Sequence, residues 1–142
     1  MDKEEAKRRL SFHSSRNEDI ENPLWESGFV RSLRQFRGEQ HLETAFHEVI
    51  QLIYVLADCF QKERLEKAVI ADLWAIVHLG KSWGSNEEMF IPSELQQIAH
   101  FTEQISYPVF CLLDGTDCET AFDLYIHEYP ERAQALVELR KK

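Results

Sequence analysis

The chain has 142 residues, a formal net charge of −9 and 44% hydrophobic residues, with only five glycines and four prolines. This length and composition exclude a disordered chain and favour a single helix-rich domain with a core of its own. No uninterrupted apolar run approaches the roughly 20 residues of a membrane-spanning helix, so we expect neither a spanning segment nor a membrane partner.

Three cysteines, Cys59, Cys111 and Cys118, follow neither a zinc-binding spacing nor a disulfide framework. The first residues are charged and no apolar stretch follows them, so the sequence shows no targeting signal. Both observations predict a cytoplasmic protein with reduced thiols.

Residues 1–20 carry balanced charges and few large apolar side chains. We therefore expect a loose arm or a short helix there, ahead of a helical bundle domain of residues 21–142. Asn22-Pro23 is a helix start, because the amide side chain caps the first turn and proline suits its first position. Apolar side chains then share one helix face as far as Gly38: Trp25, Phe29, Leu33 and Phe36.

Two long segments with a helical apolar period, residues 42–60 and 65–83, flank the charged connection 61–64. That connection is too short for a parallel crossover, so we predict an antiparallel hairpin at the centre of the bundle. In the second segment the apolar arc covers about half of the helix circumference. So wide an arc implies contact with more than one neighbour.

The segment after residue 84 predicts further helices. Pro92 opens one of them, with Ser93 and Gln96 at capping-box spacing, and Pro108 is expected to bend or restart it. The apolar run 109–113 suits either a helical turn or a short strand. We predict helix, because no second strand is available to pair with it.

Thr116 and Glu119 again have capping-box spacing and open a helix that reaches Tyr129, and Pro130 begins or kinks the last one. The fold class that follows is all-α. We predict a single-domain helical bundle of about five or six helices around the central antiparallel hairpin.

Five polar side chains of the central pair are candidates for a ligand pocket: His47, Gln51, Asp58, Asp72 and His78. Asp72 lies at the edge of the apolar arc, where a lone buried carboxylate is costly unless it is hydrogen-bonded. It therefore either fills a polar gap at a helix crossing or faces a pocket. The stripe from His47 to Asp58 is either a solvated helix face or one wall of a cleft.

No catalytic signature is present. Gly80-Lys81-Ser82 resembles the end of a phosphate-binding loop, but Ala75 replaces the required glycine and no strand precedes it. The six histidines do not pair at helical spacing. We therefore expect no enzyme, no catalytic residue, no metal site and no cofactor.

The charge distribution is the most informative feature. Residues 82–131 contain no Lys or Arg and ten Asp or Glu. A focused negative potential speeds and orients encounter with a basic protein, and it repels the phosphates of nucleic acids. The plain alternative is that the acidic residues only keep the domain in solution.

The first hypothesis is thus a small acidic protein-binding module, for example an immunity or antitoxin-like inhibitor of a basic partner protein, with no nucleic-acid partner. The acidic contacts that we predict are Glu87, Glu88, Asp114, Asp117, Glu119, Asp123 and Glu128. Tyr125 and Tyr129 are the predicted aromatic anchors, since aromatic residues dominate interface hot spots.

Two alternatives belong to other classes. The first is a ligand-binding or metal-binding bundle, or even an enzyme, with a site between the central helices. The second is a helical scaffold that self-associates, for example as a homodimer, through the wide apolar arc of residues 65–83.

Overall fold

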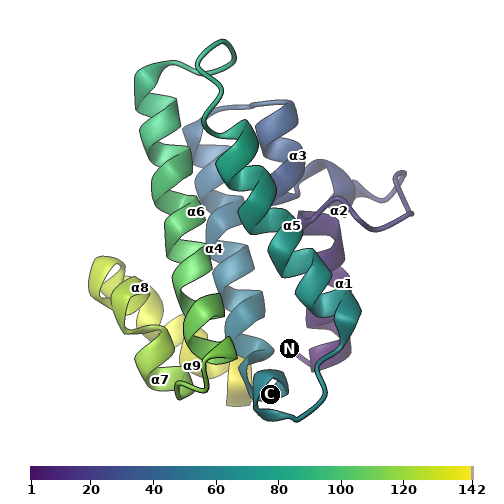
Figure 1. Cartoon of the computed structure of the whole chain (residues 1–142), viewed down its shortest axis with the longest axis vertical. Helices are drawn as coiled ribbons and strands as arrows, with labels where there is room; N and C mark the ends of the chain where they lie inside the picture. Colours follow the sequence, from purple (N-terminus) through teal and green to yellow (C-terminus); the bar gives the residue numbers. More distant parts are fainter. Residues whose placement is uncertain (142) are drawn as a thin grey trace.

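The computed structural model describes residues 1–141, which fold into helices without a β-strand in that range (Figure 1). In chain order the elements are α1 (Lys3–His13), α2 (Pro23–Glu26), α3 (Phe29–Arg34), α4 (Glu39–Val55), the 3-10 helix η1 (Ala57–Gln61), α5 (Lys67–Trp83), α6 (Pro92–Leu113), α7 (Cys118–Ala121), α8 (Asp123–Glu128), the 3-10 helix η2 (Pro130–Arg132) and α9 (Ala133–Lys141). The prediction of an all-α single-domain bundle is confirmed, but residues 1–141 form nine α-helices instead of the expected five or six, because several predicted helices are divided into shorter ones.

The four longest helices, α1, α4, α5 and α6, form the bundle, and α4 and α5 run antiparallel. These two helices lie on a diagonal of the bundle. Each packs against α1, α3 and α6, and the two have few direct contacts with one another. The connection between α4 and α5 is longer than the predicted residues 61–64, so it can span this diagonal. Helix α4 ends at Val55, the 3-10 helix η1 follows, and α5 begins only at Lys67. Burial from several sides explains the wide apolar arc of α5.

Helix α1 is part of the core. Its side chains Ala6, Leu10 and Phe12 are buried, and the helix packs against α4 and α5. Of the two forms expected for residues 1–20, residues 3–13 thus adopt the short helix. At the last residue of α1, His13 Nδ1 accepts a hydrogen bond of 3.0 Å from the Phe29 backbone N–H, which joins α1 to the start of α3.

The helix that was predicted from Asn22 to Gly38 is divided in two. Asn22 caps α2 as expected, accepting from the Leu24 N–H at 3.0 Å. The chain then becomes extended at Gly28, whose backbone lies so close to the Phe12 carbonyl that an added Cβ would meet the oxygen at 2.5 Å. Only glycine fits this contact, which lies where α2 has ended and α3 begins.

Helix α6 continues without interruption through Pro108 and includes residues 109–113, so the prediction of helix for that run is correct and the expected restart at Pro108 is not. Its start also differs from the predicted capping box. The helix begins at Pro92, and Glu94 accepts from the Ile91 N–H at 3.0 Å.

The predicted helix from Thr116 to Tyr129 is likewise interrupted, at Phe122, and Asp117 caps its first part, α7, rather than Thr116. Helix α9 returns along α4, so the two ends of the chain lie side by side (Figure 1). The amino group of Met1 donates to the Leu139 carbonyl at 3.2 Å. No helix within residues 1–141 is both long enough and apolar enough to cross a membrane.

Candidate functional site

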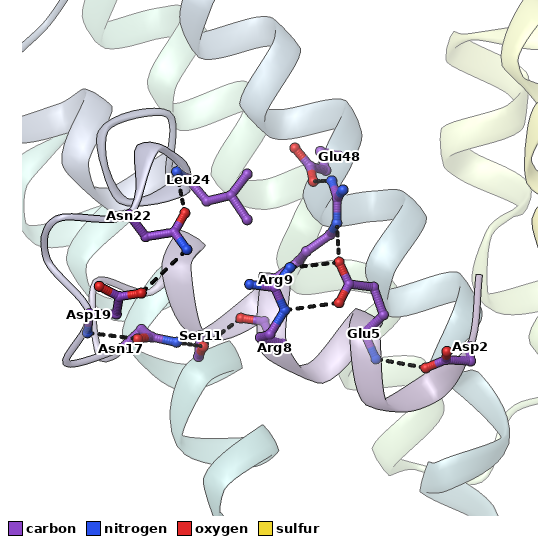
Figure 2. Close-up of polar contacts among 10 residues, drawn as sticks. All are labelled: Asp2, Glu5, Arg8, Arg9, Ser11, Asn17, Asp19, Asn22, Leu24 and Glu48. Atoms are coloured by element: carbon purple, nitrogen blue, oxygen red, sulfur yellow. Dashed lines mark hydrogen bonds and ion pairs between the residues drawn. The ribbon is translucent and has the colours of Figure 1, made fainter.

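The charged side chains of α1 are paired with one another and with α4. Glu5 accepts hydrogen bonds from Arg8 and Arg9, and Arg9 also donates to Glu48 at 2.9 Å (Figure 2). The hydrogen bond from Arg8 holds the pKa of Glu5 at about 2, and that from His13 does the same for Glu48, again at about 2. The cations of this part of the chain are therefore engaged inside the fold.

The exposed carboxylates around α7 and α8 form no ion pair with a Lys or Arg of residues 1–141, although Arg140 lies close by and donates to Cys118 Sγ of α7 at 2.9 Å. The exposed members of this group are Asp114, Asp117, Glu119, Asp123 and Glu128. Over residues 1–141 their single ion-pair geometry joins Glu128 to His100, whose Nε2 lies 3.6 Å away. We call these five carboxylates the α7–α8 surface.

Glu87 and Glu88, which the sequence assigned to the same contact, lie elsewhere. Both are exposed on the connection between α5 and α6, at the end of the bundle opposite α7 (Figure 1). The 22 residues of α6, about 33 Å at 1.5 Å per residue, separate Glu87 and Glu88 from Asp114 at its far end, whereas Glu128 lies beside His100, partway along that helix. The seven predicted acidic contacts therefore form two separate sites.

Tyr125 is not available as an anchor, which corrects the sequence-based prediction. Its side chain is 1% exposed and packs among the aromatic rings of Phe46 and Tyr129. Tyr129 is only half-buried, and its hydroxyl lies 3.3 Å from His100 Nε2. The apolar period that placed both tyrosines on one face of the helix identified core positions rather than an exposed interface.

His47 is buried in the same aromatic cluster rather than lining a pocket. Its Nδ1 lies 2.7 Å from the Tyr125 hydroxyl, and its Nε2 lies 3.4 Å from a carboxylate oxygen of Glu43. This arrangement suits a neutral ring that accepts from Tyr125 and donates to Glu43. Burial is the main cause that lowers the pKa of His47.

The other pocket candidates are dispersed over the bundle. Gln51 is half-buried on α4. Asp58 of η1 accepts a hydrogen bond from Arg140 of α9 and lies 3.9 Å from Lys3, so it holds the two chain ends together. His78 is exposed and lies parallel to the Trp74 ring, with 6.3 Å between the ring centroids. These three side chains lie on different elements, α4, η1 and α5.

Asp72 fills a polar gap at a helix crossing, the first of its two predicted roles. It is buried in α5 and accepts from the Ser14 hydroxyl at 2.9 Å and from Arg16 at 2.8 Å. Arg16 also donates to the Ala68 carbonyl, so the loop after α1 is fastened to α5. Burial raises the pKa of Asp72, against the opposing effect of these two donors.

The sequence did not predict a groove between α5 and α6. Where the two helices approach each other, an added Cβ on Gly80 would lie 2.6 Å from Thr102 Oγ1, and one on Gly84 would lie 2.2 Å from Ile98 Cγ2. Two glycines one turn apart thus allow close packing at this end. Toward the other end larger side chains separate the helices, which diverge in Figure 1.

The space left by this divergence is an open apolar cavity of about 400 Å³. Four exposed apolar side chains lie on its walls: Trp74 of α5, and Tyr107, Phe110 and Leu113 of α6. Trp74 is 68% exposed and Phe110 63%. The pair Gly80 and Gly84 and the spacing of the three α6 residues are the sequence signals that point to this groove.

Comparison of the chain with protein-family models, with curated proteins and with solved structures finds no match. Among residues 1–141 no three His, Cys, Asp or Glu side chains are grouped so as to hold a metal ion. The candidate sites that the geometry supports are therefore two surfaces, the acidic α7–α8 surface and the apolar α5–α6 groove.

Proposed function

We propose that the chain is a protein-binding module that holds a basic partner protein on its α7–α8 surface, as an immunity or antitoxin-like inhibitor does. The observation that carries this proposal is the contrast between the two halves of the chain. Glu5 of α1 and Glu48 of α4 are paired with arginines, whereas none of the five carboxylates of the α7–α8 surface forms an ion pair with a Lys or Arg within residues 1–141.

Unpaired carboxylates that share a surface add their potentials, because no internal cation cancels them. A basic partner gains from that field in two ways. Its approach is steered, and its Lys or Arg side chains find carboxylates that no other Lys or Arg occupies. Leu124 of α8 is exposed beside these charges and offers an apolar contact. A reduced, cytoplasmic setting, expected from the three cysteines, belongs to the same proposal.

A charge-reversal experiment with a matched control tests this function. The variant Asp123→Lys/Glu128→Lys changes the α7–α8 surface, and Glu87→Lys/Glu88→Lys makes the same change in net charge at the other end of the bundle. Each protein is immobilised and used to capture proteins from its native cell extract at low salt, and bound proteins are eluted with rising salt.

We expect wild type and the Glu87/Glu88 variant to retain the same basic protein and to release it as screening increases. The Asp123/Glu128 variant should fail to retain it. Equal retention by all three proteins would refute the α7–α8 surface, and retention that does not depend on salt would refute the electrostatic mechanism. Circular dichroism of both variants establishes that the helices remain folded.

A further inference from the structure

The α5–α6 groove exposes an apolar area of the size that marks an interaction site. An aromatic side chain has about 150–250 Å² of surface to bury. At the fractions to which they are exposed, the four side chains on the walls of the groove together leave roughly 400–500 Å² in contact with solvent. The largest apolar patch on a monomeric protein is about 300–600 Å² and is often functional. A standard interface buries about 800 Å² on each partner, so these four side chains supply roughly half of the area that such an interface needs.

The two walls of the groove carry charges of opposite sign. Lys81 of α5 lines the groove, and Lys67 lies two turns before Trp74 on the same side of that helix. On α6, Glu103 lines the groove and Asp114 ends the helix. Within residues 1–141 none of these four charges has an ion-pair partner, whereas the charges of α1 are paired.

The contacts between α5 and α6 show at which level along the groove each of these charges lies. Gly80 lies opposite Thr102 and Gly84 opposite Ile98, and the helices are antiparallel. Lys81 is therefore within about one turn of the level of Glu103, and by the same register Lys67 is within about one turn of Asp114. A positive wall thus faces a negative wall at both ends of the groove.

We propose that the groove binds the α5–α6 face of a second copy of this chain, so that the protein is a homodimer around a four-helix contact. A two-fold axis along the groove places α5 of each copy against α6 of the other at the same height. Lys81 then meets Glu103 of the second copy, and Lys67 meets Asp114 of the second copy. Symmetry forms each of these pairs twice.

The other two-fold arrangement, with the axis across the groove, is disfavoured by the same charges. It places α5 against α5 in opposite directions, so that Lys81 of one copy lies near Lys67 of the other. Like charges that face each other across an interface cost free energy and select against that pairing. The charge pattern therefore selects a single orientation.

Trp74 is the anchor of the proposed contact. It is the most exposed large apolar side chain of the groove and, in the favoured orientation, enters the groove of the second copy. A cavity of ~150 Å³ is enough to hold benzene, so the groove, at about 400 Å³, has room for an indole ring. Aromatic side chains seated in such pockets are the usual hot spots of interfaces.

Analytical ultracentrifugation of the full chain over a range of concentrations tests the dimer. Wild type should sediment with twice the chain mass of 16.7 kDa. Trp74→Ala should raise the dimer dissociation constant by roughly 30-fold or more. The matched control is Ile20→Ala, which removes an equally exposed apolar side chain, 65% exposed, from the loop after α1 and should leave the mass unchanged.

Charge reversal tests the orientation. Lys81→Glu and Glu103→Lys should each weaken the dimer about 5-fold or more, and the double variant should regain most of the lost affinity, because its pairs are restored with exchanged signs. A wild-type protein whose sedimenting mass stays at 16.7 kDa up to ~0.2 mM overturns the dimer, even if the groove binds some other partner. Tighter association of the Lys81→Glu variant overturns the orientation, since the introduced carboxylate would then pair with Lys67 of the second copy across the other axis.

Discussion

Replacing Gly80 by Ala tests the close packing that positions the groove. The new Cβ would lie 2.6 Å from Thr102 Oγ1 and 2.9 Å from its Cγ2. Thr102 is buried and β-branched, so it has little freedom to move aside. Overpacking of this kind costs about 1–3 kcal/mol, and the better helix propensity of Ala returns about 0.8–1 kcal/mol. We expect Gly80→Ala to lower the free energy of unfolding by about 1 kcal/mol.

The sign of this effect should reverse when Thr102 is shortened. In a Thr102→Ala background both of the closest atoms are gone, and the nearest remaining one, the Cβ of residue 102, lies 3.3 Å away. Gly80→Ala should then stabilise the protein by about 0.5–1 kcal/mol through helix propensity alone. The double-mutant cycle thus predicts a coupling of about 1.5–2 kcal/mol.

Urea unfolding followed by circular dichroism, at one fixed protein concentration, measures all four proteins of the cycle. Each also carries Trp74→Ala, so that self-association does not contribute to the stability. A coupling near zero, or a Gly80→Ala variant that is more stable in the presence of Thr102, would show that the helices do not approach each other as closely as the two glycines indicate.

Two further predictions concern buried ionisable groups. Burial raises the pKa of Asp72 above its ordinary 3.8, so wild type should lose stability relative to Asp72→Asn as the pH rises from below 3.8 through the raised pKa. Urea unfolding across that pH range measures the difference in stability, and parallel pH profiles of the two proteins would contradict the prediction. Burial lowers the pKa of His47 below its ordinary 6.5, so wild type should lose stability relative to His47→Gln as the pH falls below 6.5. A difference in unfolding free energy between the two proteins that stays constant from pH 8 to pH 5 would show that the ring is not held neutral.

The helices themselves follow from local sequence pattern. The apolar period located α4 and α5, Asn22 was a correct cap, and residues 109–113 were correctly assigned to helix. These features depend on neighbours within one or two turns, which a sequence displays directly. The sequence alone also shows that residues 82–131 contain no lysine or arginine.

The features that the sequence did not predict depend on contacts between distant residues. The helix predicted from Asn22 is interrupted at Gly28, which rests on the Phe12 carbonyl, and Asp72 is satisfied by Arg16, which lies 56 positions earlier. Apolar periodicity places Tyr125 and Trp74 on apolar faces alike, but it does not say which face a neighbouring helix covers. Tyr125 was therefore mistaken for an exposed anchor, and the groove around Trp74 was missed.

The adjacency of the two chain ends makes the topology nearly circular. The Met1 amino group donates to the Leu139 carbonyl, and Arg140 donates to Asp58. A short linker can therefore join the two ends of the chain. A protein permuted to start within the exposed loop at Glu87 and Glu88 would keep every helix of the bundle intact and would carry its new ends about 33 Å from the old ones. Fluorophores or fusion partners attached at either pair of ends would thus report on opposite poles of the same bundle.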